Sequence, residues 1–373
     1  MKTIFFIFFI NFSVLGCIYS QNNKHTPERN PIELSMDKNA ESLLSDPTIN
    51  AISMGVYKDG EIYINHYGEL DKGQGNTPTD ETIYEIASVS KTFAGTLVAQ
   101  AELDGKLNLE DDIRKYLKED FSNLEYEGNP IRIKHLITHT SRLPKFLPIT
   151  INKLFENPND SLAFKIYQIE KDYNRDKFII DLQSITIDTI PGTKFDYSNA
   201  DTELAAYILE NIYKKPYYQL IREEICNKIG MTSTGTVIPD DLKINLTNGY
   251  TVNDVLAPNM AHQLWGAGGG IMSTIPDMIK YIKFQLDNNN ETAVKSHQVV
   301  YENGEEKIGY YWPISNDENN GTYFSHHGGA FGTQNLLFVI PKKNIGVIIF
   351  TNQSLPETAG KLYKVMDGIL KDL

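Results

Sequence analysis

The sequence predicts an α+β fold, in which an antiparallel sheet is built from the two ends of the chain, flanked by helices, and interrupted by a mainly helical lobe. Residues 51–68, AISMGVYKDGEIYINHYG, read as two alternating strands around an Asp-Gly turn, as in a β-hairpin. Three more strand patterns lie near the other end of the chain, in TYFSHHGG, NLLFVIP and IGVIIFTN. We therefore expect a sheet lobe from about 36–95 and 262–373, a helical lobe from about 96–261, and a cleft where the lobes meet.

The expected helices follow from apolar spacing and from start signals. Thr274 can cap a helix together with Asp277 three residues later. The final segment, PETAGKLYKVMDGIL, has the apolar stripe of an amphipathic helix. The helices expected in the interior are 91–104, 110–117, 132–139, 160–172, 200–213, 216–229 and 275–286.

Composition limits the class of protein. The chain has 373 residues, 41% of them hydrophobic, which suits one large domain or two interleaved ones. A net charge of −13 argues against nucleic acid as a partner, because phosphate binding needs clustered Lys and Arg; such acidity is typical of a solvated surface. Only Cys17 and Cys226 are present, so we expect no disulfide framework and a packed core thiol at Cys226.

The first twenty residues resemble an export signal. Lys2 precedes the apolar run IFFIFF and then INFSVLGC, a stretch too short to span a bilayer comfortably. Two endings stay open: VLGC is similar to a lipobox, apart from the large Leu15, and would make Cys17 a lipid anchor, whereas ordinary cleavage near Ser20 would release a periplasmic or secreted protein. We expect residues 21–35 to be a polar tether and residues 36–373 to form the folded domain.

The stretch IASVSKTF places a lysine one helical turn after a serine, among apolar residues. Positions i and i+3 share a helix face, so Lys91 can reach Ser88 but is poorly placed for Ser90. Burial near the start of a helix favours the uncharged amine, which can take the serine's proton, while free backbone N–H groups there can face an oxyanion. The tetrapeptide SVSK alone would also fit a surface lysine on an amphipathic helix.

A second candidate element is PGTKFDYSNADTELAAYIL, a loop that leads into a helix. Tyr197 and Asn199 occupy alternate positions of the extended part, so their side chains would project together. The phenol could carry a proton and the amide could orient a carbonyl and the lysine. The alternative is an Asn-based turn with Tyr197 packed in the core.

A third candidate element is SHHGGAFG. His326 and Gly328 would face the same side of a strand, where glycine lets a ligand or a second backbone approach closely. His326 could donate a hydrogen bond to a carbonyl or a carboxylate. The alternative is a glycine-rich turn between two strands.

In this order, the three elements and their flanks resemble the serine β-lactamase-related family, which includes class C β-lactamases, D,D-peptidases and many esterases. The resemblance runs from about residue 40 to the C-terminus and also covers IRIKHLITHTSRLP and GAGGGIMSTIPDMIKYI. It implies a β-lactamase/transpeptidase-like fold. By position, Ser88 matches the acylated nucleophile, Lys91 its partner base, and Tyr197 and Asn199 the Tyr-x-Asn element that moves protons and binds the substrate amide.

The third motif has the His-x-Gly form that is typical of the esterase and peptidase branches, whereas class C β-lactamases carry Lys-Thr-Gly there. The resemblance makes His326 its leading residue and implies an oxyanion hole from the N–H groups of Ser88 and Gly329. A neutral histidine gives no fixed cation for a substrate carboxylate, which argues against an efficient β-lactamase.

The segment around HTSRLP contains an unusual arginine and a pair of histidines. Arg142 stands where the family usually has glycine, and a positive φ there would add modest strain. His135 and His139 have a spacing that can bind zinc, but Leu136 stands where a zinc-protease motif needs glutamate. We therefore expect a packed or capping histidine pair, no metal and no cofactor.

The favoured interpretation is an exported serine hydrolase that acts on an ester, amide or lactam carbonyl through an acyl-enzyme. One alternative is a catalytically silent protein that binds penicillin or peptidoglycan peptides, and another is an unrelated structural lipoprotein. We expect a monomer whose partner is a small molecule or a short peptide. Residues 145–178 are expected to line the cleft and set its specificity.

Overall fold

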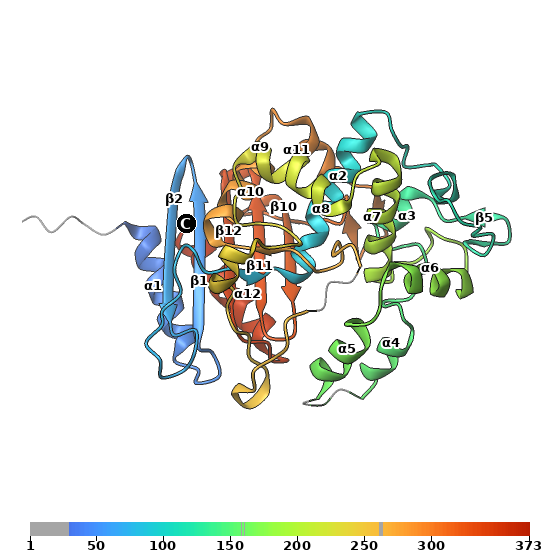
Figure 1. Ribbon diagram of the computed structural model, residues 1–373. Helices are drawn as coiled ribbons and strands as arrows, with labels where there is room; N and C mark the ends of the chain where they lie inside the picture. Colours follow the sequence, from blue (N-terminus) through green and yellow to red (C-terminus); the bar gives the residue numbers. More distant parts are fainter. Residues whose placement is uncertain (1–29, 158, 160, 261–263) are drawn as a thin grey trace, which may run out of the picture.

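A six-stranded antiparallel sheet forms the centre of the computed structural model, which describes residues 30–157, 159, 161–260 and 264–373 (Figure 1). The strand order is β2-β1-β12-β11-β10-β9, so the first hairpin pairs with the end of the chain, as predicted. The sheet strands are β1 (Ala51–Lys58), β2 (Glu61–Gly68), β9 (Ile314–Asp317), β10 (Gly321–Gly329), β11 (Gln334–Ile340) and β12 (Ile345–Thr351). Three short pairs lie outside it: β3 (Tyr84–Glu85) with β6 (Met272–Ser273), β4 (Glu125–Tyr126) with β5 (Asn129–Pro130), and β7 (Tyr301–Glu302) with β8 (Lys307–Ile308).

The turn of the first hairpin explains its register. Asp59 and Gly60 both have positive φ, 51° and 98°, which is what a two-residue turn of type I′ requires. Lys58 then pairs directly with Glu61. The Asp-Gly signal in the sequence is therefore confirmed.

Each predicted helical segment contains helical structure. The segment 110–117 holds only a 3₁₀ turn, η2 (Ile113–Tyr116), and the segment 216–229 passes through a π-helical stretch (Ile221–Cys226). The helices are α1 (Pro31–Leu44), α2 (Ser90–Leu103), α3 (Ile133–Ile137), α4 (Thr150–Leu154), α5 (Leu162–Glu170), α6 (Arg175–Ser184), α7 (Asn199–Tyr213), α8 (Tyr217–Leu220), α9 (Asn227–Ile229), α10 (Ile275–Leu286), α11 (Glu291–Ser296) and α12 (Thr358–Asp372).

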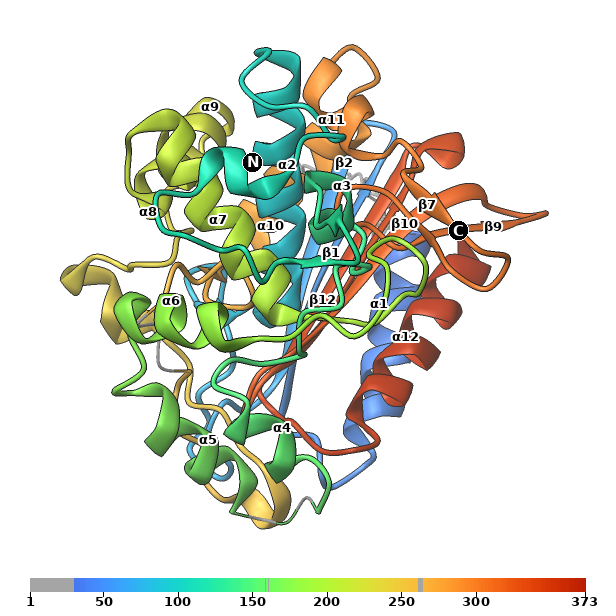
Figure 2. The ribbon, with the colours of Figure 1, turned by 90° about the vertical axis from the view of Figure 1, so that its right-hand side faces the viewer.

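Helices cover both faces of the sheet. α1 and α12 pack side by side on one face (Figure 2), and α10 packs on the other. β12 serves both layers, because Val347 and Ile349 point toward α1 and α12 while Ile348 and Phe350 point the opposite way. α10 lies so close to the sheet that a Cβ on Gly346 would sit 2.1 Å from Ile282 Cγ2.

The N-terminal tether ends earlier than the sequence indicated. Residues 31–35 form the first turn of α1, where the Asn30 side chain accepts a hydrogen bond from the N–H of Ile32 at 2.8 Å and Pro31 opens the helix. Ile32 and Met36 then bury their side chains against α12. The predictions for residues 1–29, including Cys17, lie outside the described residues.

Two further expectations concern Cys226 and the membrane. Cys226 is buried with its thiol free, as predicted for a core residue. Within the described ranges, every helix is too short or too polar to cross a bilayer. The helices α3 to α7 lie together to one side of the sheet (Figure 1), and residues of α5, α6 and α7 line a cavity together with residues of β10.

Candidate active site

Ser88 lies where the chain turns from β3 into α2. Between them, the 3₁₀ turn η1 (Ala87–Val89) begins with Ala87 at φ 45°, a value that a residue with a Cβ rarely adopts. The N–H of Ile86 donates to the carbonyl of Ile271 at 3.0 Å, which fixes the entry to this turn. The sharp turn presents Ser88 to the cavity, and strained backbone of this kind is often found at functional sites.

The amine of Lys91 is fully buried among three oxygen atoms. Its Nζ lies 3.1 Å from Ser88 Oγ and 2.6 Å from Asn199 Oδ1, and it also donates to the carbonyl of Gly268. The predicted reach from Lys91 to Ser88 is confirmed. Ser90, which the spacing excluded, instead accepts a backbone N–H at 3.0 Å.

Tyr197 reaches the same serine from the loop before α7. Its phenol donates to Ser88 Oγ at 2.9 Å, and its ring centre lies 5.0 Å from Lys91 Nζ. The next residue, Ser198, caps α7 by accepting the N–H of Asp201 at 3.1 Å. The extended backbone up to this cap is why Tyr197 and Asn199 both point into the site, as predicted.

The loop of residues 139–142, HTSR, packs against Tyr197. The His139 ring packs 4.5 Å from the Tyr197 ring, centre to centre, and its Nδ1 accepts the N–H of Ser198 at 3.3 Å. Ser141 donates to the carboxyl of Asp201, whose pKa burial raises well above its usual value. These contacts join the loop to the start of α7.

Arg142 adopts the conformation that the glycine pattern suggested, with φ at 72°. Its guanidinium donates to Asp188 at 3.0 Å and to Asp196 at 3.1 Å, and Asp196 directly precedes Tyr197. The side chain therefore gives two ion pairs to the Tyr197 loop, which a glycine there would lack.

The two histidines with zinc-like spacing have separate structural partners. His135 accepts the N–H of Arg132 at 3.1 Å and so caps α3, while Gly192 packs so closely that a Cβ there would sit 2.8 Å from His135 Nε2. His139 packs under Tyr197, as described above. Within the described ranges, His, Cys, Asp and Glu side chains form no group of three or more suited to a metal ion.

His326 lies on β10 with its ring buried. Nδ1 lies 2.9 Å from the carbonyl oxygen of His327, so the N–H is on Nδ1 and Nε2 carries the lone pair. Burial lowers the pKa of His326 to about 3. The ring is therefore a neutral acceptor at Nε2, which differs from the donor role expected for it.

Gly328 and Gly329 have different surroundings. A Cβ on Gly328 would lie 2.4 Å from the carbonyl oxygen of Ile86, so this glycine lets β10 approach the turn η1 that carries Ser88. Gly328 is not among the residues that line the cavity, and its role in substrate binding stays a prediction. Gly329 lines the cavity together with Ser88.

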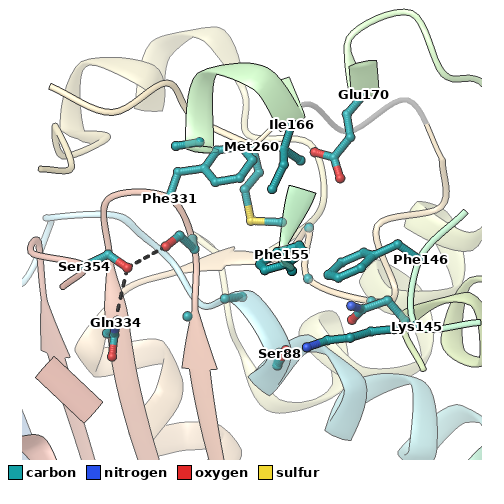
Figure 3. Close-up of a pocket in the computed structure, with 18 of the residues that line it drawn as sticks. Ser88, Lys145, Phe146, Phe155, Ile166, Glu170, Met260, Phe331, Gln334 and Ser354 are labelled. Atoms are coloured by element: carbon teal, nitrogen blue, oxygen red, sulfur yellow. Dashed lines mark hydrogen bonds between the residues drawn. The ribbon is translucent and has the colours of Figure 1, made fainter. Parts of the chain in front are cut away.

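A cavity of about 970 Å³ opens above these groups (Figure 3). One wall carries Ser88, Tyr197 and His326, and the opposite wall comes from residues 145–178, as predicted. The side chains on that second wall are mainly apolar: Phe146, Leu147, Phe155, Leu162 and Ile166.

Three groups of the site were not singled out individually from the sequence. The Gly268 carbonyl, the Lys145 side chain and the Glu170 carboxyl all contact Lys91 or line the cavity. Lys145 directly follows HTSRLP, and the N–H of Asn199 donates to its carbonyl at 2.9 Å, so the motif's position could have indicated it. A backbone carbonyl and a single glutamate in an unpatterned insert give no sequence signal.

Comparisons with known proteins found a matching family model, similar sequences and similar solved structures. A family model described as Beta-lactamase matches residues 36–368. Protein flp of Staphylococcus aureus strain N315 is 27% identical over 336 residues, which are 87% of this chain but only 64% of that protein, so the chain spans less than two thirds of this relative. D-alanyl-D-alanine-carboxypeptidase/endopeptidase AmpH of Escherichia coli K12 is 25% identical over 384 residues, with 96% and 94% coverage. A β-lactamase/D-alanine carboxypeptidase from Pseudomonas syringae shares the fold, with a TM-score of 0.77 at 19% identity over 92% of this chain and 99% of that one.

Proposed function

Since this chain belongs to the Beta-lactamase family, we propose that it is an exported serine hydrolase that works through an acyl-enzyme. Ser88 attacks an ester, amide or lactam carbonyl, and water then releases the acyl group. The observation that carries the proposal is the convergence on one hydroxyl, with Lys91 Nζ at 3.1 Å and the Tyr197 phenol at 2.9 Å from Ser88 Oγ.

Lys91 acts as the base in its uncharged form. A neutral amine has two N–H groups and one lone pair. Asn199 Oδ1 and the Gly268 carbonyl accept the two N–H groups, which leaves the lone pair facing Ser88 Oγ. The surrounding oxygens thus orient the base toward the proton that it removes.

The remaining groups take part in later steps. Tyr197 passes a proton to the leaving group, and the backbone N–H groups of Ser88 and Gly329 stabilise the oxyanion. His326 Nε2, as a neutral acceptor, orients the leaving group or the water that resolves the acyl-enzyme. In each of these roles the residue contacts the reacting atoms. The four residues all line the same cavity: Ser88, Tyr197, His326 and Gly329.

The proposed substrates are short peptides that end in D-alanine and small esters. AmpH and the Pseudomonas syringae protein are both named for D-alanine carboxypeptidase activity, and the His-x-Gly motif fits the peptidase and esterase branches better than the β-lactamases. The pattern of residues 1–20 supports action outside the cytoplasm, with lipid attachment at Cys17 or release after cleavage near Ser20.

A silent binding protein of the same fold is the second candidate. The buried lysine beside Ser88 favours the enzyme, because a binder gains nothing from desolvating an amine against a hydroxyl.

A fluorophosphonate probe followed by intact-mass analysis distinguishes the enzyme from the silent binding protein. We expect one phosphonyl group on the wild-type protein and none on Ser88→Ala. Labelling that persists in the variant would mean that a residue other than Ser88 is the nucleophile. Absence of labelling in the wild type would favour the binding protein.

A panel of substrates then distinguishes the activities. Purified protein is assayed with p-nitrophenyl esters, with D-alanyl-D-alanine peptides and with the chromogenic cephalosporin nitrocefin. We expect turnover of the esters and the peptides, with nitrocefin hydrolysed least because the third motif lacks a fixed cation. Nitrocefin as the best substrate would contradict this order.

A further inference from the structure

Glu170 places a carboxyl group in the apolar wall of the cavity. It is the last residue of α5, and its side chain points into the space above Phe146 (Figure 3). Its Oε2 atom is buried without a hydrogen-bond partner among the described residues. A buried carboxyl oxygen is normally paired, so its lack of a partner calls for a functional explanation.

The surroundings of Glu170 offer little that could stabilise its charge. Phe146 and Phe155 stack with their ring centres 5.2 Å apart, and Ile166 and Met260 lie beside them (Figure 3). Burial, followed by the nearby Glu203 carboxyl, raises the pKa of Glu170 to about 7. These surroundings therefore disfavour the carboxylate form of Glu170.

Other charged or titratable groups near this wall are already engaged. Glu203 accepts the N–H groups of Gly268 at 2.7 Å and Trp265 at 3.0 Å. The phenol of Tyr173 donates to Asp181 at 2.8 Å. Lys145 lies over the Phe155 ring, 5.3 Å from its centre, and forms no ion pair with Glu170 among the described contacts.

We propose that Glu170 forms a subsite for a cationic group, an ammonium carried at the end of an apolar arm of the substrate. The arm lies along the aromatic wall, and the ammonium supplies the opposite charge that the Glu170 carboxylate lacks among the described residues. The inference rests on the proposed function, because it assigns a substrate class to the cavity that contains Ser88. It adds a specificity residue and leaves the chemistry at Ser88 unchanged.

The test compares matched esters with and without a terminal cation. One series of p-nitrophenyl esters carries a trimethylammonium or an isosteric tert-butyl group on the acyl chain, and a second series carries it on the alcohol. The wild type is expected to prefer the cationic member of at least one series by kcat/KM. Glu170→Gln is expected to reduce that preference roughly ten- to hundredfold, the usual range for a hydrogen bond or ion pair to a charged group.

The matched control is Glu156→Gln, which makes the same change of charge in the same insert. Glu156 is exposed and does not line the cavity, so its variant should keep the wild-type preference. Because each variant's neutral ester is the reference, partial misfolding cancels from the ratio. Equal loss in both variants would mean a general effect of protein charge and would overturn the proposal.

The pH dependence gives an independent readout. A quaternary ammonium does not titrate, so any change in the preference comes from the protein. Only the carboxylate form of Glu170 attracts the cation, so the preference should rise with pH through about 7 and then level off. Glu170→Gln should show a flat profile, and the same rise in this variant would overturn the assignment.

Failure of the subsite and failure of the proposed function give different results. Turnover of neutral esters without preference for a cation in either series overturns the subsite alone. Absence of Ser88 phosphonylation and of all turnover overturns the hydrolase. In that case, calorimetric binding of an alkyl trimethylammonium ion to the wild type and to Glu170→Gln still decides the subsite, because equal affinities refute it.

Discussion

Lys91 keeps its amine in a fully buried position because nearby oxygen atoms replace water around it. Asn199 lies 2.6 Å from its Nζ, and Ser88 lies 3.1 Å away on the remaining side. A group with such partners is held in one orientation, so its removal affects proton transfer and not only packing.

We expect Lys91→Ala to slow acylation of Ser88 by roughly two to four orders of magnitude, the usual effect of losing a positioned base. Lys91→Arg should be comparably slow, since a guanidinium does not give up its proton. Single-turnover kinetics with a p-nitrophenyl ester measures both, with thermal unfolding as the check on folding. A near-normal rate in either variant would contradict the base role.

Arg142 combines an unfavourable backbone angle with two ion pairs. Its φ of 72° strains a residue with a Cβ, while its contacts with Asp188 and Asp196 are lost in any small replacement. Arg142→Ala and Arg142→Gly both lose the ion pairs and differ in the strain. We expect the glycine variant to be more stable than the alanine variant by about 1 kcal/mol in urea unfolding. Equal stabilities would show that the turn relaxes without cost.

Among the elements, β10 and η1 depend on each other for position. The contact runs through the backbone, with Gly328 against the carbonyl of Ile86, two residues before Ser88. A displacement of β10 therefore changes the distance between Gly329 and Ser88, which face the same substrate carbonyl in the proposed mechanism. Small misplacements of this kind cost large factors in rate.

We expect Gly328→Ala to reduce the acylation rate roughly 10- to 100-fold, because its Cβ would lie 2.4 Å from a backbone oxygen. Gly360→Ala on α12 is the matched control, since nothing lies within 4 Å of a Cβ there. The phosphonylation rate with a fluorophosphonate measures both. An unaffected Gly328→Ala would mean that the strand and the turn move apart without consequence.

Over the whole molecule, buried histidines link stability to pH. Burial lowers the pKa of His297 to about 3, below the value of about 6.5 for an unfolded chain. A group with a lowered pKa binds its proton more readily in the unfolded state. Its contribution to stability is full above about pH 6.5 and is lost as the pH falls toward 3.

His297→Phe tests this linkage. The ring of His297 stacks 3.8 Å from that of Phe324, so phenylalanine keeps the packing and removes the titration. Between pH 7 and pH 5, we expect the variant to lose about 2 kcal/mol less unfolding free energy than the wild type. Guanidinium unfolding at both pH values measures the difference. The same loss in both proteins would mean that a group other than His297 takes up the proton.

The sequence predicted elements best where long apolar patterns were bounded by turn, cap or motif signals. The hairpin of β1 and β2, the strands β10 to β12 and the helices α2, α7 and α10 occur where their patterns indicated. α1 was missed because its role depends on α12, more than 300 residues later in the chain, and α6 because its apolar residues do not form a clear stripe. Such elements are determined by tertiary packing more than by local preference.

The features of the site also fall into those that the sequence predicted and those that it did not. Ser88, Lys91, Tyr197 and Asn199 could be placed together because fixed motif spacing leads to fixed geometry. The tautomer of His326 depends on the rotamer that turns its ring toward the carbonyl of the next residue, His327, and the exposure of Glu170 to the cavity depends on how α5 folds back. Neither the ring orientation nor the position of α5 follows from residue types alone.

The pairing of β1 with β12 has a consequence for the order of synthesis. Thr351 donates to the carbonyl of Ala51, 300 residues earlier in the chain. Until the ribosome has made β12, β1 lacks one of its two neighbouring strands. We therefore expect the central sheet to close only late in synthesis.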